Sequence, residues 1–346
     1  MGEKVDKQKQ KMLRKQVAPY EKADTRKSVI QTINTLVPFF VIWILAYQSL
    51  SVSYFLTLGL AVVGAGLLTR MFIIFHDCCH HSFFKNRKAN KILGTITGIL
   101  TLFPYHQWQH DHSIHHATSS NLDKRGTGDI WVLTVDEYVS ASLFTKIRYR
   151  LYRNPFVMFG LGPTYVFLFK NRFNKKGAKR EERINLYITN IAIAVIVTIL
   201  CLTIGWQAFL LVQGPLFLVA GSIGVWLFYV QHTFEDSYFE PNDKWDYVLA
   251  AVEGSSFYKL PKVLQWFTGN IGFHHVHHLS PRVPNYNLED AHNNTEELQH
   301  VPTITLRTSL SSLKFRLWDE EQKKFVRYKD IKAMPDMKRA LAQTKS

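Results

Sequence analysis

Histidines grouped in three short clusters give this chain its clearest chemical signal. Fifteen histidines are present, and none falls between residues 1 and 75 or between 117 and 231. The clusters read His76-Asp-Cys-Cys-His80-His81, His110-Asp-His112-Ser-Ile-His115-His116 and His274-His275-Val-His277-His278. Side chains three or four residues apart share one face of a helix, so each cluster can direct several imidazoles at one point.

These spacings predict a metal cluster, because neutral imidazole is the commonest metal ligand among side chains. The candidate ligands are His76, His80, His112, His115, His116, His274, His277 and His278, with His232 as a ninth. Eight or nine ligands exceed the four of a tetrahedral zinc site and suit two metals with open positions. Nitrogen ligation fits iron, copper, zinc or nickel, and the spacing does not choose among them.

Long apolar runs must position these histidines. Residues 28–50 and 51–75 form one pair, and residues 184–206 and 208–230 form another. About 20 apolar residues cross a hydrocarbon core, so each run is long enough to span a membrane. The sequence therefore predicts an all-α integral membrane protein with two transmembrane hairpins and a cytosolic helical cap. The shorter stretches 92–105 and 155–169 suit interfacial or re-entrant segments, although a third hairpin stays open.

The distribution of charge predicts the orientation. The chain has 42 basic and 27 acidic residues, a net charge of +15, and its basic residues crowd positions 1–27, 85–91 and 170–183. By the positive-inside rule these segments are cytosolic, as are both termini. All the histidines then lie on the cytosolic face of the cell membrane. The apolar runs need lipid, so the charge is not explained by nucleic acid.

Six segments follow from this pattern. Residues 1–27 are predicted to be a basic, solvated and unstructured tail, and residues 28–75 the first hairpin. Residues 76–183 hold the first two clusters, and residues 184–231 form the second hairpin. Residues 232–310 form the cap with His232 and the third cluster, and 311–346 a C-terminal tail, solvated from Lys323 onward. Cys78, Cys79 and Cys201 suggest no disulfide framework.

The ordered motifs H-x-x-x-H, H-x-x-H-H and H-x-x-H-H around two hairpins resemble the histidine boxes of the membrane fatty acid desaturases. The three clusters are therefore called the first, second and third box. Trp108 stands four residues before His112, and Gln231-His232-Thr233 resembles the isolated histidine motif of the acyl-lipid branch. The segment from Asn270 to Leu288 resembles the third box of that branch and the residues that follow it. The resemblance covers about residues 29–292 and is nearest to the Bacillus-type Δ5 acyl-lipid desaturases.

This resemblance implies a non-haem centre of two iron ions with O2 as co-substrate. The implied reaction removes two hydrogens from an acyl chain of a membrane phospholipid and leaves a cis double bond, at Δ5 for the Bacillus type. A role in cold adaptation is implied in the same way. Electrons would come from a ferredoxin or flavodoxin, acidic carriers that the basic cytosolic surface would attract. The sequence has no His-Pro-Gly-Gly haem motif and no G-x-G-x-x-G, so we expect the carrier to be a separate protein.

Several alternatives stay open. His81 could replace His80 as a ligand, a spacing used in the acyl-CoA branch. His110, Asp77, Asp111, Asp129 and Asn270 are expected to orient the ligands rather than to bind metal. A di-iron acyl or alkane hydroxylase would share the same boxes. A membrane metal transporter would place its ligands inside the spans, where no histidine is predicted. The sequence does not indicate the oligomeric state or the headgroup preference.

Overall fold

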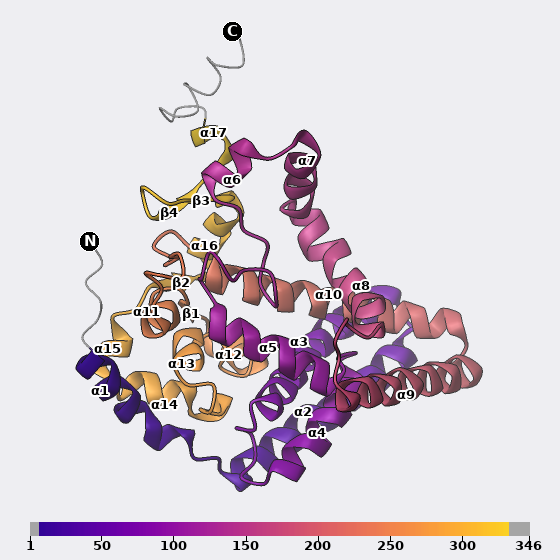
Figure 1. Cartoon of the computed structure of the whole chain (residues 1–346). Coiled ribbons are helices and arrows are strands. Elements are labelled where there is room, and N and C mark those ends of the chain that lie inside the picture. The colour runs from indigo at the N-terminus through magenta and orange to yellow at the C-terminus, as the bar shows by residue number, and fades with distance from the viewer. Residues whose placement is uncertain (1–6, 332–346) are drawn as a thin grey trace.

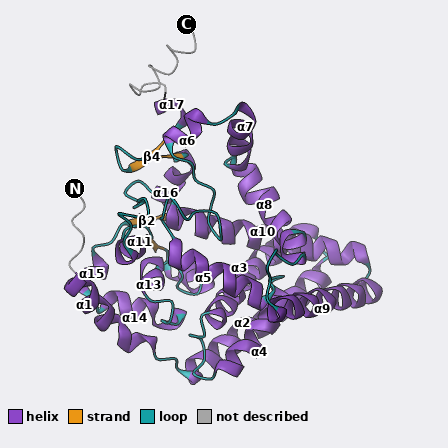
Figure 2. Ribbon diagram, in the orientation of Figure 1, coloured by secondary structure: helices purple, strands orange, loops and turns teal. Residues whose placement is uncertain are grey.

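The computed structural model describes residues 7–331 as an assembly of helices with two short two-stranded sheets (Figures 1 and 2). Four helices are long and apolar enough to cross a membrane: α2 (Thr25–Ser49), α3 (Tyr54–Cys79), α9 (Arg180–Ile204) and α10 (Trp206–His232). They correspond to the four predicted runs, so the prediction of an all-α chain with two membrane-length hairpins is confirmed.

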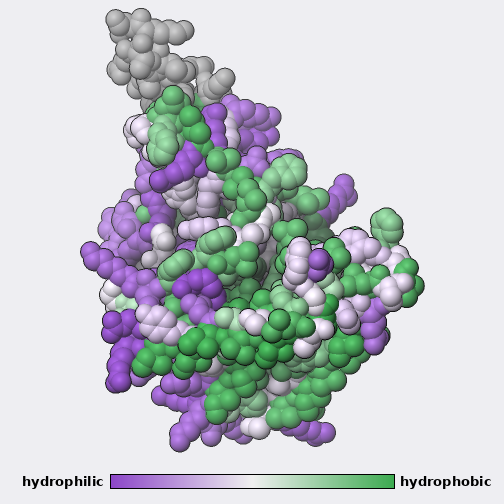
Figure 3. All heavy atoms as spheres, turned by 90° about the vertical axis from the view of Figure 1, so that its right-hand side faces the viewer, coloured by the Kyte–Doolittle hydropathy of each residue, from purple (hydrophilic) through white to green (hydrophobic). Residues whose placement is uncertain are grey.

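Local chemistry sets the ends of these helices. The Asp24 carboxylate accepts hydrogen bonds from the backbone N–H groups of Arg26 and Lys27, at 2.8 and 3.2 Å, and so caps the start of α2. Gly205 joins α9 to α10 with a φ of 88°, a conformation that other residues rarely adopt. Apolar side chains cover much of the face drawn in Figure 3, below the polar atoms at its upper left. That surface is suited to contact with lipid.

Both inner helices continue past the apolar runs. Helix α3 ends at Cys79, so His76 lies on its last turn, and α10 ends at His232. At 1.5 Å per residue, His76 lies about 33 Å from the start of α3 at Tyr54, and His232 lies about 39 Å from the start of α10 at Trp206. The two hairpins therefore present His76 and His232 at the same end of the bundle.

The remaining helices form the connection between the hairpins and the cap. Their bounds are α4 (Arg87–Leu100), α5 (Tyr105–Thr118), α6 (Val135–Ser140), α7 (Leu143–Tyr152), η2 (Val157–Leu161), α8 (Gly162–Leu168), η3 (Lys170–Arg172), α11 (Tyr247–Val252), α12 (Lys262–Phe267), α13 (His274–Leu279), η4 (Asn285–Asn287), α14 (Leu288–Asn293), α15 (Glu296–Gln299), α16 (Leu306–Ser309), η5 (Leu310–Lys314) and α17 (Tyr328–Ile331). Strand β1 (Phe257–Lys259) pairs in parallel with β2 (Thr303–Thr305). Strand β3 (Leu317–Asp319) pairs in antiparallel with β4 (Lys324–Val326).

The two short apolar stretches do not form a third hairpin. Helix α4 has 14 residues, and η2 and α8 form one continuous helical segment over residues 155–168, so both stretches are too short to span the hydrocarbon core alone. Helix α4 packs against α3 and α9, whereas α8 and η2 pack against α10. Helix α4 therefore lies between the two hairpins, and α8 and η2 lie against the second hairpin.

The prediction of an unstructured N-terminal tail is wrong for the described part of that segment. Residues 7–17 form α1 (Lys7–Val17), and η1 (Ala18–Glu21) continues it. Leu13 and Val17 share one face and pack in the same buried cluster as Val276 and Leu279. This i, i+4 apolar pair was too short a signal to outweigh the lysines around it. Helix α1 thus supports the helix that carries the third histidine cluster.

The C-terminal tail is also more ordered than predicted, although residues 332–346 lie outside the described part. Phe325 and Val326 of β4 are buried, and the Phe325 ring packs against Trp318 of β3 with ring centroids 5.3 Å apart. Trp318 in turn contacts Phe239, which follows α10. This segment therefore packs onto the cap, and the prediction of a solvated surface from Lys323 onward does not hold for β4.

Close packing between α4 and α5 should be sensitive to one added methyl group. A Cβ on Gly94 would lie 2.3 Å from the ring of buried Tyr105. We expect Gly94→Ala to destabilise the fold by about 1–3 kcal/mol because the helices must separate. Thermal unfolding in detergent would measure the effect. Gly224→Ala in α10 is the matched control, since nothing lies within 4 Å of that position, and equal stability of both variants would contradict the packing.

Candidate metal centre

The ends of two long helices and two short helices bring the histidine clusters together. His76 lies on the last turn of α3 and His80 directly follows that helix, while α5 carries the second cluster on the face that is turned inward. His232 is the last residue of α10, and α13 carries the third cluster. All nine predicted ligands converge at the junction of the two hairpins with the cap.

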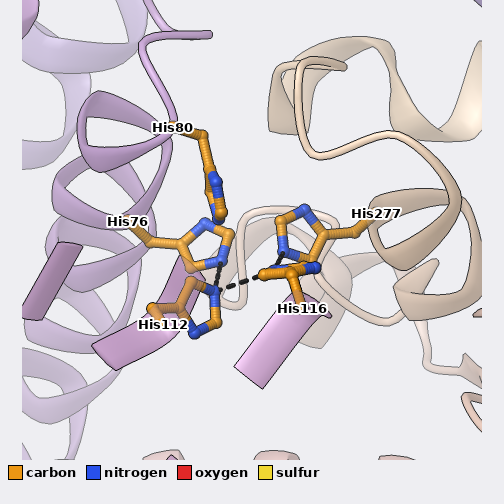
Figure 4. A group of neighbouring side chains, drawn as sticks. All are labelled: His76, His80, His112, His116 and His277. Carbon is orange, nitrogen blue, oxygen red and sulfur yellow. Dashed lines mark hydrogen bonds between the residues drawn. The ribbon is translucent and has the colours of Figure 1, made fainter. Parts of the chain in front are cut away.

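Five of these imidazoles form a first group, drawn in Figure 4. Its members are His76, His80, His112, His116 and His277, each with a ring nitrogen within 4.8 Å of the others. The Nε2 atom of His112 lies 3.0 Å from Nε2 of His76 and 3.0 Å from Nε2 of His116. Nε2 of His277 lies 2.9 Å from that of His116.

A second group adjoins the first. Ring nitrogens of His115, His232 and His278 lie within 4.8 Å of one another. His274 extends this group, because its Nε2 lies 2.9 Å from Nε2 of His232 and 3.1 Å from that of His278. The rings of His116 and His278 are 4.4 Å apart between centroids, so the two groups are in contact.

Burial favours the neutral form of six of these imidazoles. It lowers the pKa of His80, His112, His116, His274, His277 and His278 well below the usual range, and neighbouring imidazoles lower it further. A neutral imidazole has one bare nitrogen that can bind a metal. Both groups therefore offer lone pairs at neutral pH.

Outer hydrogen bonds fix which nitrogen is bare. His232 Nδ1 lies 3.1 Å from the carbonyl oxygen of Gly254, which can only accept, so Nδ1 carries the proton. Nδ1 of His76 lies 3.0 Å from an Asp77 oxygen, and Nδ1 of His115 lies 2.6 Å from an Asp129 oxygen. Each of these contacts leaves Nε2 bare and directed inward, the arrangement typical of metal-bound histidines.

The residues present fit metal ions. The bare Nε2 of His232 faces Nε2 of His274 at 2.9 Å, while Nε2 of His115 is buried without a hydrogen-bond partner among the described residues. Two nitrogens bound to one ion at about 2.1 Å and at right angles lie about 3.0 Å apart, which matches the observed spacings. The number of ligands and the two adjoining groups fit two ions better than one.

Asp77 is held by residues that follow the third cluster. Its second oxygen accepts hydrogen bonds from the backbone N–H and side-chain amide of Asn285, at 2.6 and 2.8 Å. The predicted residue Asn270 donates from its amide to the Asn285 carbonyl at 3.0 Å. It therefore reaches His76 only indirectly, through Asn285 and Asp77. Sequence reasoning missed Asn285, although it lies in the same trailing segment, and a backbone carbonyl such as that of Gly254 has no sequence signal.

Three predicted residues do not join the groups. His81 is exposed at a φ of 57°, and its Nε2 lies 3.1 Å from the Gln109 amide nitrogen. His110 is exposed and faces Glu182, with Nδ1 and Oε1 3.8 Å apart. Asp111 forms an ion pair with Lys175. The first box therefore directs His80, and not His81, toward the other imidazoles.

Comparisons with known proteins agree with this geometry. The family model described as fatty acid desaturase matches residues 51–306. The chain is 68% identical over 335 residues to the fatty acid desaturase of Bacillus subtilis (strain 168), covering 97% of this chain and 95% of that protein.

More distant relatives belong to photosynthetic organisms. The chloroplastic omega-6 fatty acid desaturase of Arabidopsis thaliana is 29% identical over 259 residues, 70% of this chain and 54% of that protein. The sn-1 oleoyl-lipid 12-desaturase of Synechocystis is 26% identical over 239 residues, 66% of this chain and 65% of that protein. With its four membrane-length helices and converging histidines, the chain belongs to the fatty acid desaturase family.

Proposed function

We propose that this protein is an O2-dependent di-iron acyl-lipid desaturase that introduces a cis double bond, at Δ5, into acyl chains of membrane phospholipids. The reaction balances as follows: a –CH2–CH2– unit, O2, two electrons and two protons give a –CH=CH– unit and two molecules of water. The convergence of nine imidazoles, eight of them on buried residues, is the observation that carries the proposal.

The proposed ligands are His76, His80, His112, His115, His116, His232, His274, His277 and His278. Two iron ions bound there would supply the activation of O2 that removal of two unactivated hydrogens requires. Asp77, Asp129 and the Gly254 carbonyl hold the protonated Nδ1 atoms outward. The chain thus arranges bare nitrogens in advance.

Aromatic side chains limit the access of water to the imidazoles. The Trp108 ring stacks on His112 with centroids 4.2 Å apart, and the Phe228 ring lies 5.0 Å from that of His115. Phe75 packs against Trp108 at 5.1 Å. A dry, apolar surround protects a reactive centre from side reactions and suits a hydrocarbon substrate.

The depth of the histidines supports a lipid substrate that reacts near its ester. His76 and His232 lie at the ends of membrane-length helices, where the ester groups of a bilayer lipid also lie. Carbons close to the ester are thus nearer to the imidazoles than the methyl end is. The name of the Synechocystis relative refers to a lipid-linked oleoyl chain, which supports an acyl-lipid substrate here. The Δ5 position itself rests on the resemblance to Bacillus-type enzymes.

We infer that the histidines and both termini lie on the cytoplasmic side of the cell membrane. Basic residues flank the histidine end of the bundle, and the hairpin turns at 50–53 and 205 carry no charge. An acidic ferredoxin or flavodoxin is the proposed electron donor, and exposed Lys176 and Arg180 at the start of α9 favour its approach.

Expression in a host without desaturases tests the proposed activity. We expect a new monounsaturated fatty acid in the lipid fraction, only in the presence of O2, when a ferredoxin is supplied. Gas chromatography with mass spectrometry would identify the product and locate its double bond. A hydroxylated chain would contradict desaturation and assign the protein to the di-iron hydroxylases, and a bond away from C5 would contradict Δ5.

The choice between neighbouring histidines gives a sharp test of the ligand set. His80→Ala should lower bound iron and reduce activity by at least a hundredfold, because a ligand is lost. His81→Ala should keep both, because its ring lies outside the groups. Metal analysis and turnover of the two purified variants would decide. Loss of iron in His81→Ala with retention in His80→Ala would reverse the assignment.

Charge reversal tests the proposed carrier. Lys176→Glu and Arg180→Glu together should slow carrier-dependent turnover by about tenfold at low salt, because they remove attraction for an acidic partner. Turnover with dithionite and methyl viologen should stay unchanged. Reversal of exposed Lys11 and Lys15 on α1 serves as the control. Equal carrier-dependent rates and equal salt dependence in both variants would show that this surface does not bind the carrier.

A further inference from the structure

A groove of about 660 Å³ lies between α3, α10 and the base of the cap. Its walls include Val62, Val63 and Thr69 of α3, Ser222, Ile223 and Trp226 of α10, and, from the cap, Leu260, Leu264, Leu306 and Leu310. None of the nine converging histidines lines it. The groove is therefore separate from the metal centre, although it runs along the two helices that end at His76 and His232.

The groove extends from near the middle of the membrane-length helices toward their histidine ends. Val62 lies 14 residues before His76 on α3, which is about 21 Å along a helix. At the other end the groove reaches Leu306 and Leu310, two exposed apolar residues of the cap. The groove thus extends from within the membrane-length helices to the level where the cap begins.

The groove offers few polar groups to an occupant, because its hydroxyls are already engaged. Ser222 donates to the Phe159 carbonyl at 2.6 Å, and Thr69 donates to the Ala65 carbonyl at 2.9 Å. Thr268 donates to the Leu264 carbonyl at 2.9 Å. The Tyr258 hydroxyl contacts the Ser309 hydroxyl at 3.1 Å. A hydrocarbon chain is therefore the chemistry that this surface fits.

Two basic side chains stand at the cap end of the groove. In the β1–β2 pair Tyr258 and Ile304 face the core, whereas Lys259 and Thr305 lie side by side and are exposed. Arg307 follows on α16 between the groove residues Leu306 and Leu310 and is also exposed. Neither Lys259 nor Arg307 has an ion pair with any of residues 7–331, whereas nearby Lys262 is paired with Glu289.

We propose that this groove is the entry site of one phospholipid, with an acyl chain between α3 and α10 and the phosphate of its headgroup at Lys259 and Arg307. The proposal rests on the proposed acyl-lipid desaturase function and gives it a lateral route for the substrate. Leu227 and Tyr258, which line the groove, pack in one buried cluster with Ile73, one turn before His76 on α3. The chain must pass these side chains to reach the histidines, so the groove holds the lipid before it reacts.

Photo-crosslinking tests occupancy without any need for turnover. The full-length protein in nanodiscs would be exposed to a phosphatidylglycerol whose acyl chain carries a diazirine. We expect Val63→Trp and Ile223→Trp each to reduce labelling of α3 and α10 at least fivefold, because the indole fills the groove. Val195→Trp is the matched control on the exposed face of α9. Undiminished labelling in both groove variants would overturn the proposal, whereas a failure to desaturate would not affect this readout.

Headgroup selectivity tests the basic rim. Lys259→Gln combined with Arg307→Gln should reduce the labelling preference for phosphatidylglycerol over a diacylglycerol with the same chains by about tenfold. Lys324→Gln with Lys329→Gln is the control pair, exposed at the far end of the chain. An unchanged preference for phosphatidylglycerol in this double variant would show that Lys259 and Arg307 do not bind the phosphate. Competition by acyl-CoA as strong as that by phosphatidylglycerol would assign the phosphate contact to a CoA thioester, and would overturn the phospholipid assignment.

Discussion

Bringing nine imidazoles together at one point, eight of them on buried residues, is the constraint on which the rest of this structure depends. Neutral imidazoles still carry lone pairs, and at 2.9–3.1 Å those lone pairs repel one another unless a cation lies among them. Carbonyl and carboxylate acceptors outside the groups keep the protons on Nδ1. Bound metal would therefore stabilise the folded chain, because it would offset the cost of bringing these groups together.

That constraint also explains how the hairpins and the cap are joined. Asn285 contacts Asp77 at the end of α3 and accepts a hydrogen bond from Gln31 of α2 at 2.9 Å. Arg70, a charged residue in a membrane-length helix, lies over the Trp266 ring of α12 at 4.2 Å and donates to Thr35 at 3.1 Å. These buried polar contacts link α2, α3 and the cap across the region where lipid gives way to water. Their effect is to fix the end of the first hairpin, which carries His76, against the cap that carries the third histidine cluster.

Much of this arrangement could be predicted from sequence, because the apolar runs are long and the histidine spacings are repeated. Four apolar runs of membrane length predicted the hairpins, and three spacings of histidine predicted which side chains meet. His80 was predicted as the ligand with His81 as the alternative, but the left-handed turn that directs His81 away from the groups has no sequence signal. The fold of α1 rests on two apolar residues, Leu13 and Val17, amid lysines. The contact of the Gly254 carbonyl with His232 and the groove both arise from tertiary packing. The local sequence pattern therefore could not predict them.

Metal content measured on the protein as purified from iron-replete cells is the most direct test of the central claim. The account predicts two iron ions per chain by mass spectrometry of metals, with Mössbauer parameters of nitrogen-rich, non-haem sites. Loss of iron should follow from His232→Ala, whose ring lies in the second group and outside the three boxes. A single zinc ion per chain, or full iron content in His232→Ala, would contradict a two-iron centre built from both groups.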